Sequence, residues 1–121
     1  MTDLSLPPNA GDFERAVLGS LLLDPMMFGE IDKIIKTPSA FYEHKHGWIY
    51  SAIAKIAKRK ENVDLLTVSM QLANDNLLGE CGGESYLAEM VNTVPTALNI
   101  VTYANEVSAK YISRKIFLLA Q

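Results

Sequence analysis

Residues 13–23, FERAVLGSLLL, have the spacing of a buried helix. An apolar arc this wide requires neighbours on several sides. Gly19 costs about 1 kcal/mol of helix propensity and therefore predicts a close approach by another helix. We predict that this helix is the centre of a compact helical bundle. Its apolar residues recur in two adjacent rows, which consist of Phe13, Val17 and Leu21 and of Leu18 and Leu22.

The composition fits one folded domain in a reducing compartment. The chain has 121 residues, of which 49% are hydrophobic and 21% charged. Its net charge of −3 speaks against a dedicated nucleic-acid binder. Cys81 is the single cysteine, so no internal disulfide is possible. The N-terminus lacks the pattern of a signal peptide, and no apolar run is long enough to span a membrane. We therefore expect a cytoplasmic domain without membrane contact.

Helical patterns also recur along the rest of the chain. Residues 63–70 can be read as alternating, but their neighbours are helical, so no strand is predicted. Asp24-Pro25 and Asp64 are suitable helix starts, and Asn9 or Asp12 is expected to cap the first helix. Glycines at 79–83 mark the clearest break. The predicted fold class is all-α, a bundle of about six helices. The further predicted helices cover residues 25–36, 45–60, 65–74, 84–92 and 98–120.

The spacing of apolar residues assigns an inner face to each helix. Phe41 and Tyr42, in the connector after the second helix, are expected to enter the core. The expected inner residues are Phe28, Ile31, Ile34 and Ile35 in the second helix, Trp48, Ile49, Ala52, Ile53, Ile56 and Ala57 in the third, and Leu66, Met70 and Ala73, with Leu65 and Leu72 nearby, in the fourth.

The last helix is the most informative functional element. Ile100, Ala104, Val107 and Tyr111 repeat at spacings of four, three and four residues, the seam of a helix pair. The helix is longer than its neighbours can cover, and it reaches Gln121 without a capping signal. Two interpretations remain open: the seam meets a partner helix, which we favour, or it folds back onto its own bundle.

Motifs for catalysis, phosphate or metal binding are missing from the sequence. No Gly-x-x-x-x-Gly-Lys-Ser/Thr loop is present. His44 and His46 are two residues apart, whereas metal-binding pairs on a helix need a spacing of four, so we expect a helix-start histidine and one hydrogen-bonded locally. Cys81 lies among acidic residues, which disfavour a thiolate. The cluster Lys55, Lys58, Arg59 and Lys60 is interpreted as a solvated helix end rather than a phosphate site.

The order of short motifs resembles the N-terminal domain of the DnaB-type replicative DNA helicases. The resemblance covers the chain from about Pro7 to its end. The matching residues are Pro7-Pro8, Glu14, Ala16-Val17-Leu18-Gly19, Leu21-Leu22-Leu23-Asp24, Phe41-Tyr42, His46, Ile49, Val63-Asp64-Leu65-Leu66-Thr67, Gly82-Gly83, Tyr86-Leu87-Ala88-Glu89, Asn92-Thr93, Pro95, Asn99-Ile100, Tyr103-Ala104 and Val107.

The resemblance implies a helical head followed by a long helical hairpin. It also implies that such domains pair, form a collar on a hexameric ring and receive primase, chiefly through the hairpins. A separate C-terminal domain, outside this chain, would bind ATP with magnesium and move along single-stranded DNA. The domain boundaries expected on this basis are an extended arm at 1–8, a head at 9–97, and at 98–121 the first helix of a hairpin whose second helix is missing.

The sequence therefore predicts a non-catalytic oligomerisation and primase-docking domain of a replicative helicase. It would bind no cofactor, metal or DNA itself, and its partners would be further copies, primase and a helicase loader. The alternatives are a free-standing helical adaptor or small DNA-binding regulator and, less favoured, a small enzyme. The expected interface residues are Ile100, Tyr103, Val107, Tyr111 and Arg114.

Overall fold

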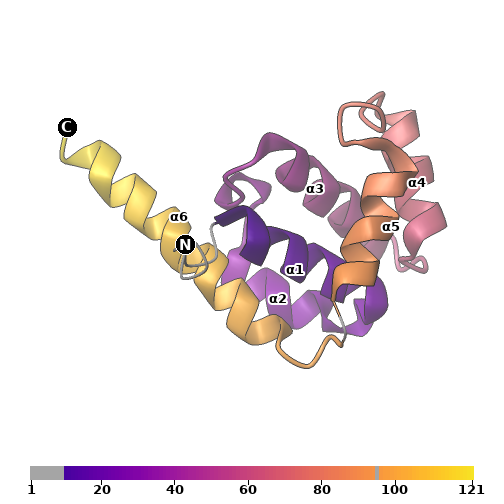
Figure 1. Cartoon of the computed structure of the whole chain (residues 1–121), viewed down its shortest axis with the longest axis horizontal. Coiled ribbons are helices and arrows are strands. Elements are labelled where there is room, and N and C mark those ends of the chain that lie inside the picture. The colour runs from indigo at the N-terminus through magenta and orange to yellow at the C-terminus, as the bar shows by residue number, and fades with distance from the viewer. Residues whose placement is uncertain (1–9, 95) are drawn as a thin grey trace, which may run out of the picture.

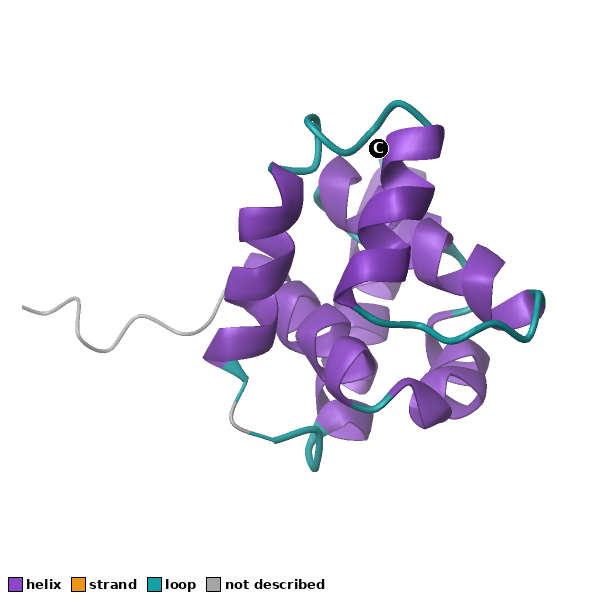
Figure 2. Ribbon diagram, turned by 90° about the vertical axis from the view of Figure 1, so that its right-hand side faces the viewer, coloured by secondary structure: helices purple, strands orange, loops and turns teal. Residues whose placement is uncertain are grey.

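The computed structural model describes residues 10–94 and 96–121 and is all-α over these ranges, as predicted (Figures 1 and 2). The expected arm at 1–8, the Asn9 cap and Pro95 lie outside the described residues. No helix in the described part of the chain is long and apolar enough to cross a membrane. The elements are α1 (Ala10–Leu23), the 3₁₀ helix η2 (Pro25–Met27), α2 (Phe28–Ile35), the 3₁₀ helix η3 (Pro38–Ala40), α3 (His44–Lys58), α4 (Leu65–Asn74), α5 (Gly83–Thr93) and α6 (Ile100–Leu119).

Helix α1 is the centre of the bundle, which confirms the prediction from residues 13–23. It packs against α3, α5 and α6 (Figure 1). Val17, Leu18 and Leu21 are fully buried, whereas Phe13 is half-buried at the edge of the core. Helices α3, α5 and α6 and the turn η2 thus contact one apolar helix. Helix α6 leaves the bundle at its C-terminal end (Figure 1).

Gly19 marks the predicted close approach between two helices. A Cβ atom at this position would lie 3.0 Å from Cγ2 of Val94 and closer still to the carbonyl oxygen of Met90. Backbone atoms of α5 therefore occupy the space that any larger side chain on α1 would need. The absence of a side chain at Gly19 allows α5 to pack directly on α1.

The two predicted aspartate caps behave differently. The Asp64 carboxylate accepts a hydrogen bond from the amide of Thr67 at 2.8 Å, and the Thr67 hydroxyl accepts one from the Asp64 amide at 2.9 Å, which closes a capping box on α4. The Asp24 side chain makes no capping hydrogen bond to the 3₁₀ turn η2 that follows it. The predicted helix at 25–36 is therefore divided into η2 and α2. The expected Asp12 cap is also wrong, since Asp12 lies inside α1.

Two predicted inner faces are wrong. Tyr42 is 64% exposed, because Phe41 alone turns into the core and Tyr42 lies beside Arg114. Helix α4 buries Val68, Ser69 and Leu72 against the bundle and leaves its other apolar side in solvent. Both sides of α4 are apolar, so the choice depends on how α4 sits against α3 and α5. The residues of α4 expected inside but found exposed are Leu66, Met70 and Ala73.

Candidate functional site

The candidate site is the distal half of α6, defined as residues 112–119; residues 100–111 are its proximal half. Large apolar side chains follow one another along the distal half, and all are exposed. A helix that is apolar and solvated over two turns is typical of an interaction surface. The exposed fractions are 53% for Ile112, 62% for Ile116, 65% for Phe117, 68% for Leu118 and 85% for Leu119.

The proximal half of α6 belongs to the core of this chain. Ile100, Ala104 and Val107 are buried where α6 packs on α1 and α2. The seam read from the sequence therefore folds back onto its own bundle over this half. This corrects the expectation that Ile100 and Val107 contact a partner, because their side chains are covered within one chain.

The other expected interface residues lie at the edge of the core. Tyr103 and Tyr111 are half-buried and pack against it. Arg114 donates a hydrogen bond to the carbonyl oxygen of Ala40 at 3.0 Å, and its guanidinium carbon lies 5.2 Å from the ring centre of Tyr42. Arg114 thus connects the start of the distal half to the head, while the role of these three residues in an interface stays a prediction.

A shallow apolar hollow extends from the head to the distal half. Its volume is about 440 Å³. Phe117 and Leu118 follow Arg114 by three and four residues, so the same helix face carries all three. Sequence reasoning missed Phe117 and Leu118 at this site, and the spacing from Arg114 was the signal that could have found them. The lining residues are Tyr42, Ser113, Arg114, Phe117 and Leu118.

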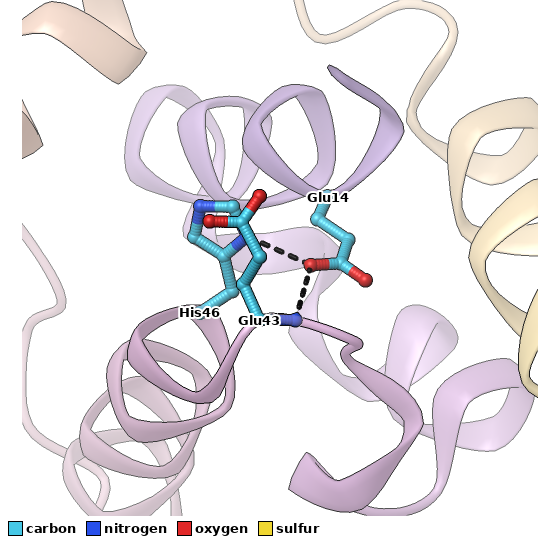
Figure 3. A group of neighbouring side chains, drawn as sticks. All are labelled: Glu14, Glu43 and His46. Carbon is cyan, nitrogen blue, oxygen red and sulfur yellow. Dashed lines mark hydrogen bonds and ion pairs between the residues drawn. The ribbon is translucent and has the colours of Figure 1, made fainter. Parts of the chain in front are cut away.

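A buried polar network links α1 with the start of α3, as Figure 3 shows, and continues to Tyr86 of α5. Glu14 and His46 are 1% and 0% exposed. The Glu14 carboxylate accepts hydrogen bonds from the amides of Tyr42, at 2.5 Å, and Glu43, at 3.3 Å, and lies 2.8 Å from Nδ1 of His46. Nε2 of His46 is 2.7 Å from the Tyr86 hydroxyl. A carboxylate from α1 thereby satisfies amides just before α3, where the helix dipole favours negative charge.

The same cluster contains atoms of the types that bind metals. Oxygen or nitrogen atoms of Glu14, Glu43 and His46 lie within 4.8 Å of one another. Both nitrogens of His46 already have hydrogen-bond partners, as do both oxygens of Glu14. The arrangement is therefore satisfied as a hydrogen-bond network. The expectation that the second histidine bonds locally is wrong, because the partners of His46 are 32 and 40 residues away in the sequence.

The basic cluster at the end of α3 is partly neutralised by nearby side chains. Lys55 lies 3.0 Å from the Asp75 carboxylate, and its hydrogen bond lowers the pKa of Asp75. Arg59 lies 3.0 Å from Glu61 and donates to the side chain of Gln71. These contacts agree with the interpretation of a solvated helix end.

Cys81 is buried and unreactive in character. Burial, with a smaller contribution from Glu80, raises the pKa of the Cys81 thiol to about 11, although Lys45 opposes the shift. The direction agrees with the sequence prediction, but its main cause is burial rather than the neighbouring acids. This thiol keeps its proton at neutral pH and is a poor nucleophile.

The fold and the site define a class of protein domain, in which an apolar helix projects from an all-α head. The profile described as the DnaB-like helicase N terminal domain matches residues 6–109, and the chain belongs to this family. A relative from Bacillus subtilis, the replicative DNA helicase DnaC, is 43% identical over 99% of this chain. The chain spans 27% of the length of that relative.

Solved structures agree with this assignment. The N-terminal domain of DnaB helicase from Mycobacterium tuberculosis is 34% identical, with a TM-score of 0.85 over 93% of this chain and 80% of that one. A DnaB-like replicative helicase, whose structure was described together with its interactions with primase, is 28% identical. It matches with a TM-score of 0.79 over 90% of this chain and 25% of its own length.

Proposed function

We propose that this chain is the oligomerisation and primase-docking domain of a replicative DNA helicase and that it is non-catalytic by itself. Membership in the DnaB-like N-terminal domain family supports the place in a helicase. The similarity to a replicative helicase described with primase supports primase as a partner. The observation that carries the proposal is the distal half of α6, whose five large apolar side chains are all more than half exposed.

In this proposal residues 98–121 contain the first helix of a helical hairpin. Its proximal half is anchored by Ile100 and Val107 in the head, and its distal half would be covered by a second helix and by neighbouring copies. Tyr111 and Arg114 stand at the boundary between the two halves, where they would contact the partner. Tyr103, half-buried on the proximal half, is the remaining proposed contact.

The helicase chemistry would belong to another domain of the longer protein. The sequence contains no phosphate-binding loop, so ATP and magnesium would bind outside these residues. The mechanism proposed for this domain is geometric: it pairs, sets the symmetry of a hexameric ring and presents helices to primase and a loader. The buried free thiol of Cys81 fits a reducing, cytoplasmic setting.

Sedimentation of the chain over a range of concentrations tests the proposal. Ile112→Asp/Ile116→Asp places two charges on the distal half, and Leu98→Asp changes a residue that is 83% exposed outside it. We expect self-association to be lost in the double variant and retained in the control. Equal masses for wild type and both variants would contradict the proposal.

Primase binding is the second measurement of the same experiment. The primase of Bacillus subtilis, the organism of the relative that is 43% identical, is titrated onto the labelled chain. We expect binding to weaken about tenfold or more in Ile112→Asp/Ile116→Asp and to remain unchanged in Leu98→Asp. Equal binding by wild type and the double variant would contradict the distal half as the docking surface, and absence of binding by the wild type would favour the adaptor alternative with a different partner.

A further inference from the structure

Charge is strongly segregated along this chain. Residues 61–109 contain seven acidic residues and no lysine, arginine or histidine. All 11 basic residues and both histidines lie outside this stretch, together with the other seven of the 14 acidic residues, so the net charge is −7 inside it and +4 outside. The acidic residues inside are Glu61, Asp64, Asp75, Glu80, Glu84, Glu89 and Glu106.

The acidic stretch carries an exposed apolar face on α4. Leu66 and Met70 are 63% and 58% exposed and are four residues apart, so they form one ridge on the outer side of the helix. Helix α4 contains no charged residue at all. A hollow of about 390 Å³ lies beside this ridge, between α4 and α5. Its lining residues are Leu65, Leu66, Glu84, Ser85 and Ala88.

Carboxylates of α5 border this apolar surface. Glu84 lines the hollow, and Glu89 follows Ser85 by four residues on the same side of the helix. Both are exposed, and neither takes part in any ion pair among the described residues. An apolar ridge beside carboxylates that lack cationic partners is complementary to a surface with the opposite charge.

We propose that this acidic α4–α5 face, made of Leu65, Leu66, Met70, Glu84, Ala88 and Glu89, binds a cationic amphipathic helix of a partner protein. An apolar side chain of that helix would enter the hollow, and others would pack along Leu66 and Met70. Lysine or arginine residues flanking its apolar stripe would pair with Glu84 and Glu89. Nucleic acid and anionic lipid do not fit, because this face would repel phosphate.

This face is independent of the proposed function. Helices α4 and α5 lie at one end of the long axis of the molecule, and the distal half of α6 projects from the other end (Figure 1). A partner on the α4–α5 face would therefore leave the distal half of α6 accessible. Variants of one face can fail without affecting the other, so the two proposals are tested separately.

Fluorescence anisotropy with a synthetic peptide tests the inference. The probe is a labelled 15-residue leucine–lysine peptide with leucines at helical spacing. One control peptide has the same composition with its leucines spread around the helix, and another has glutamate in place of lysine. We expect the chain to bind the amphipathic cationic peptide at least about tenfold more tightly than either control. Absence of binding, or equal binding of the controls, would overturn the proposal.

Variants then locate the binding surface. Leu66→Ser/Met70→Ser is expected to weaken binding about tenfold or more, and Glu84→Gln/Glu89→Gln about threefold to tenfold with a smaller salt dependence. The matched controls change exposed residues elsewhere, Met26→Ser/Leu98→Ser and Glu30→Gln/Glu106→Gln, and are expected to bind within about twofold of wild type. Equal weakening by the controls would overturn the assignment to this face.

Sedimentation without peptide identifies the kind of occupant. All substituted side chains are exposed, so circular dichroism is expected to show unchanged folding. Leu66→Ser/Met70→Ser should leave the solution mass of the chain unchanged. Loss of self-association in this variant would show that a second copy covers the face, which would overturn the assignment to a different protein.

Discussion

The two halves of α6 have similar apolar patterns and opposite environments. Ile100, Ala104 and Val107 on the proximal half are buried, whereas Ile112 and Ile116 on the distal half are exposed. The halves are parts of one uninterrupted helix. The pattern of apolar residues therefore predicts that α6 is a helix with a covered face, but it does not say which molecule covers that face.

The difference follows from the lengths of the helices. Helix α1 has 14 residues and α6 has 20, which at 1.5 Å per residue is about 21 Å against about 30 Å. The first residues of α1, Ala10 and Gly11, line one hollow together with Lys110 and Arg114 of α6. Beyond this level α6 extends past the described part of α1, so its apolar side chains face solvent.

Aspartate substitutions should give the largest difference in stability between the proximal and distal halves of α6. Val107→Asp buries an unpaired charge in the core and is expected to lower the free energy of unfolding by about 4 kcal/mol or to prevent folding. Ile116→Asp places the same group in water, so we expect a change within about 0.5 kcal/mol. Denaturant titration followed by circular dichroism measures the free energy of unfolding of both variants. If Val107→Asp does not fold, Val107→Ala takes its place, with an expected decrease of about 2 kcal/mol.

Replacing an alanine by leucine should give a smaller difference in stability between a buried and an exposed position of α6. Ala104 is fully buried between α6 and its neighbours, so Ala104→Leu overpacks the core and is expected to cost about 1–3 kcal/mol. Ala109 is exposed on the same helix, and Ala109→Leu should be neutral within about 0.5 kcal/mol. Thermal unfolding tests the pair, and similar losses for both would mean that the proximal half is not packed as described.

Removing the contact between the distal half and the head should have a modest, local effect. Arg114→Met keeps the length of the side chain but loses the hydrogen bond to Ala40 and the stacking on Tyr42. We expect the free energy of unfolding to fall by about 1 kcal/mol and hydrogen exchange to become faster over residues 113–119. Exchange in α1 should not change. Lys115→Met, which leaves the Ala40 contact intact, is the matched control.

The smallest expected effect concerns Cys81 as a reporter of core opening. The Cys81 side chain is fully buried, and burial raises its pKa to about 11, so labelling at pH 8 is expected to require the core to open. Ile116→Ser should leave the labelling rate within about twofold of wild type. Ala104→Leu should raise it about fivefold or more, because more molecules are transiently open. A faster rate in Ile116→Ser would show that the distal half supports the head.

Local chemistry allowed much of the fold to be predicted from sequence. The capping box needs only Asp64 and Thr67, which are three residues apart, and Gly19 signals a close approach wherever the second helix comes from. The predicted Asp64 cap and the predicted close approach at Gly19 are both confirmed. The burial of Glu14 was not predictable in this way, because its partners Tyr42, Glu43 and His46 are 28 to 32 residues away.

The candidate surfaces were harder to predict because apolar residues lie on both sides of the helices involved. In α4, Val68 and Leu72 on one side compete with Leu66 and Met70 on the other, and no charged residue identifies the outer side. The wrong choice hid the apolar α4–α5 face from sequence reasoning. For α6 the interpretation that the seam folds back onto its own bundle is right for the first turns, which join the core, whereas a partner on the exposed last turns stays a prediction.

The network of Glu14, His46 and Tyr86 has a consequence for the order of folding. The amides of Tyr42 and Glu43, just before α3, find their acceptor on α1, and the histidine that contacts this acceptor is held from α5. These contacts join parts of the chain that are 28 to 40 residues apart, so loop-closure entropy opposes their early formation. The amides that precede α3 therefore gain their acceptor only after α1 and α3 have met, and α5 joins the same network through Tyr86.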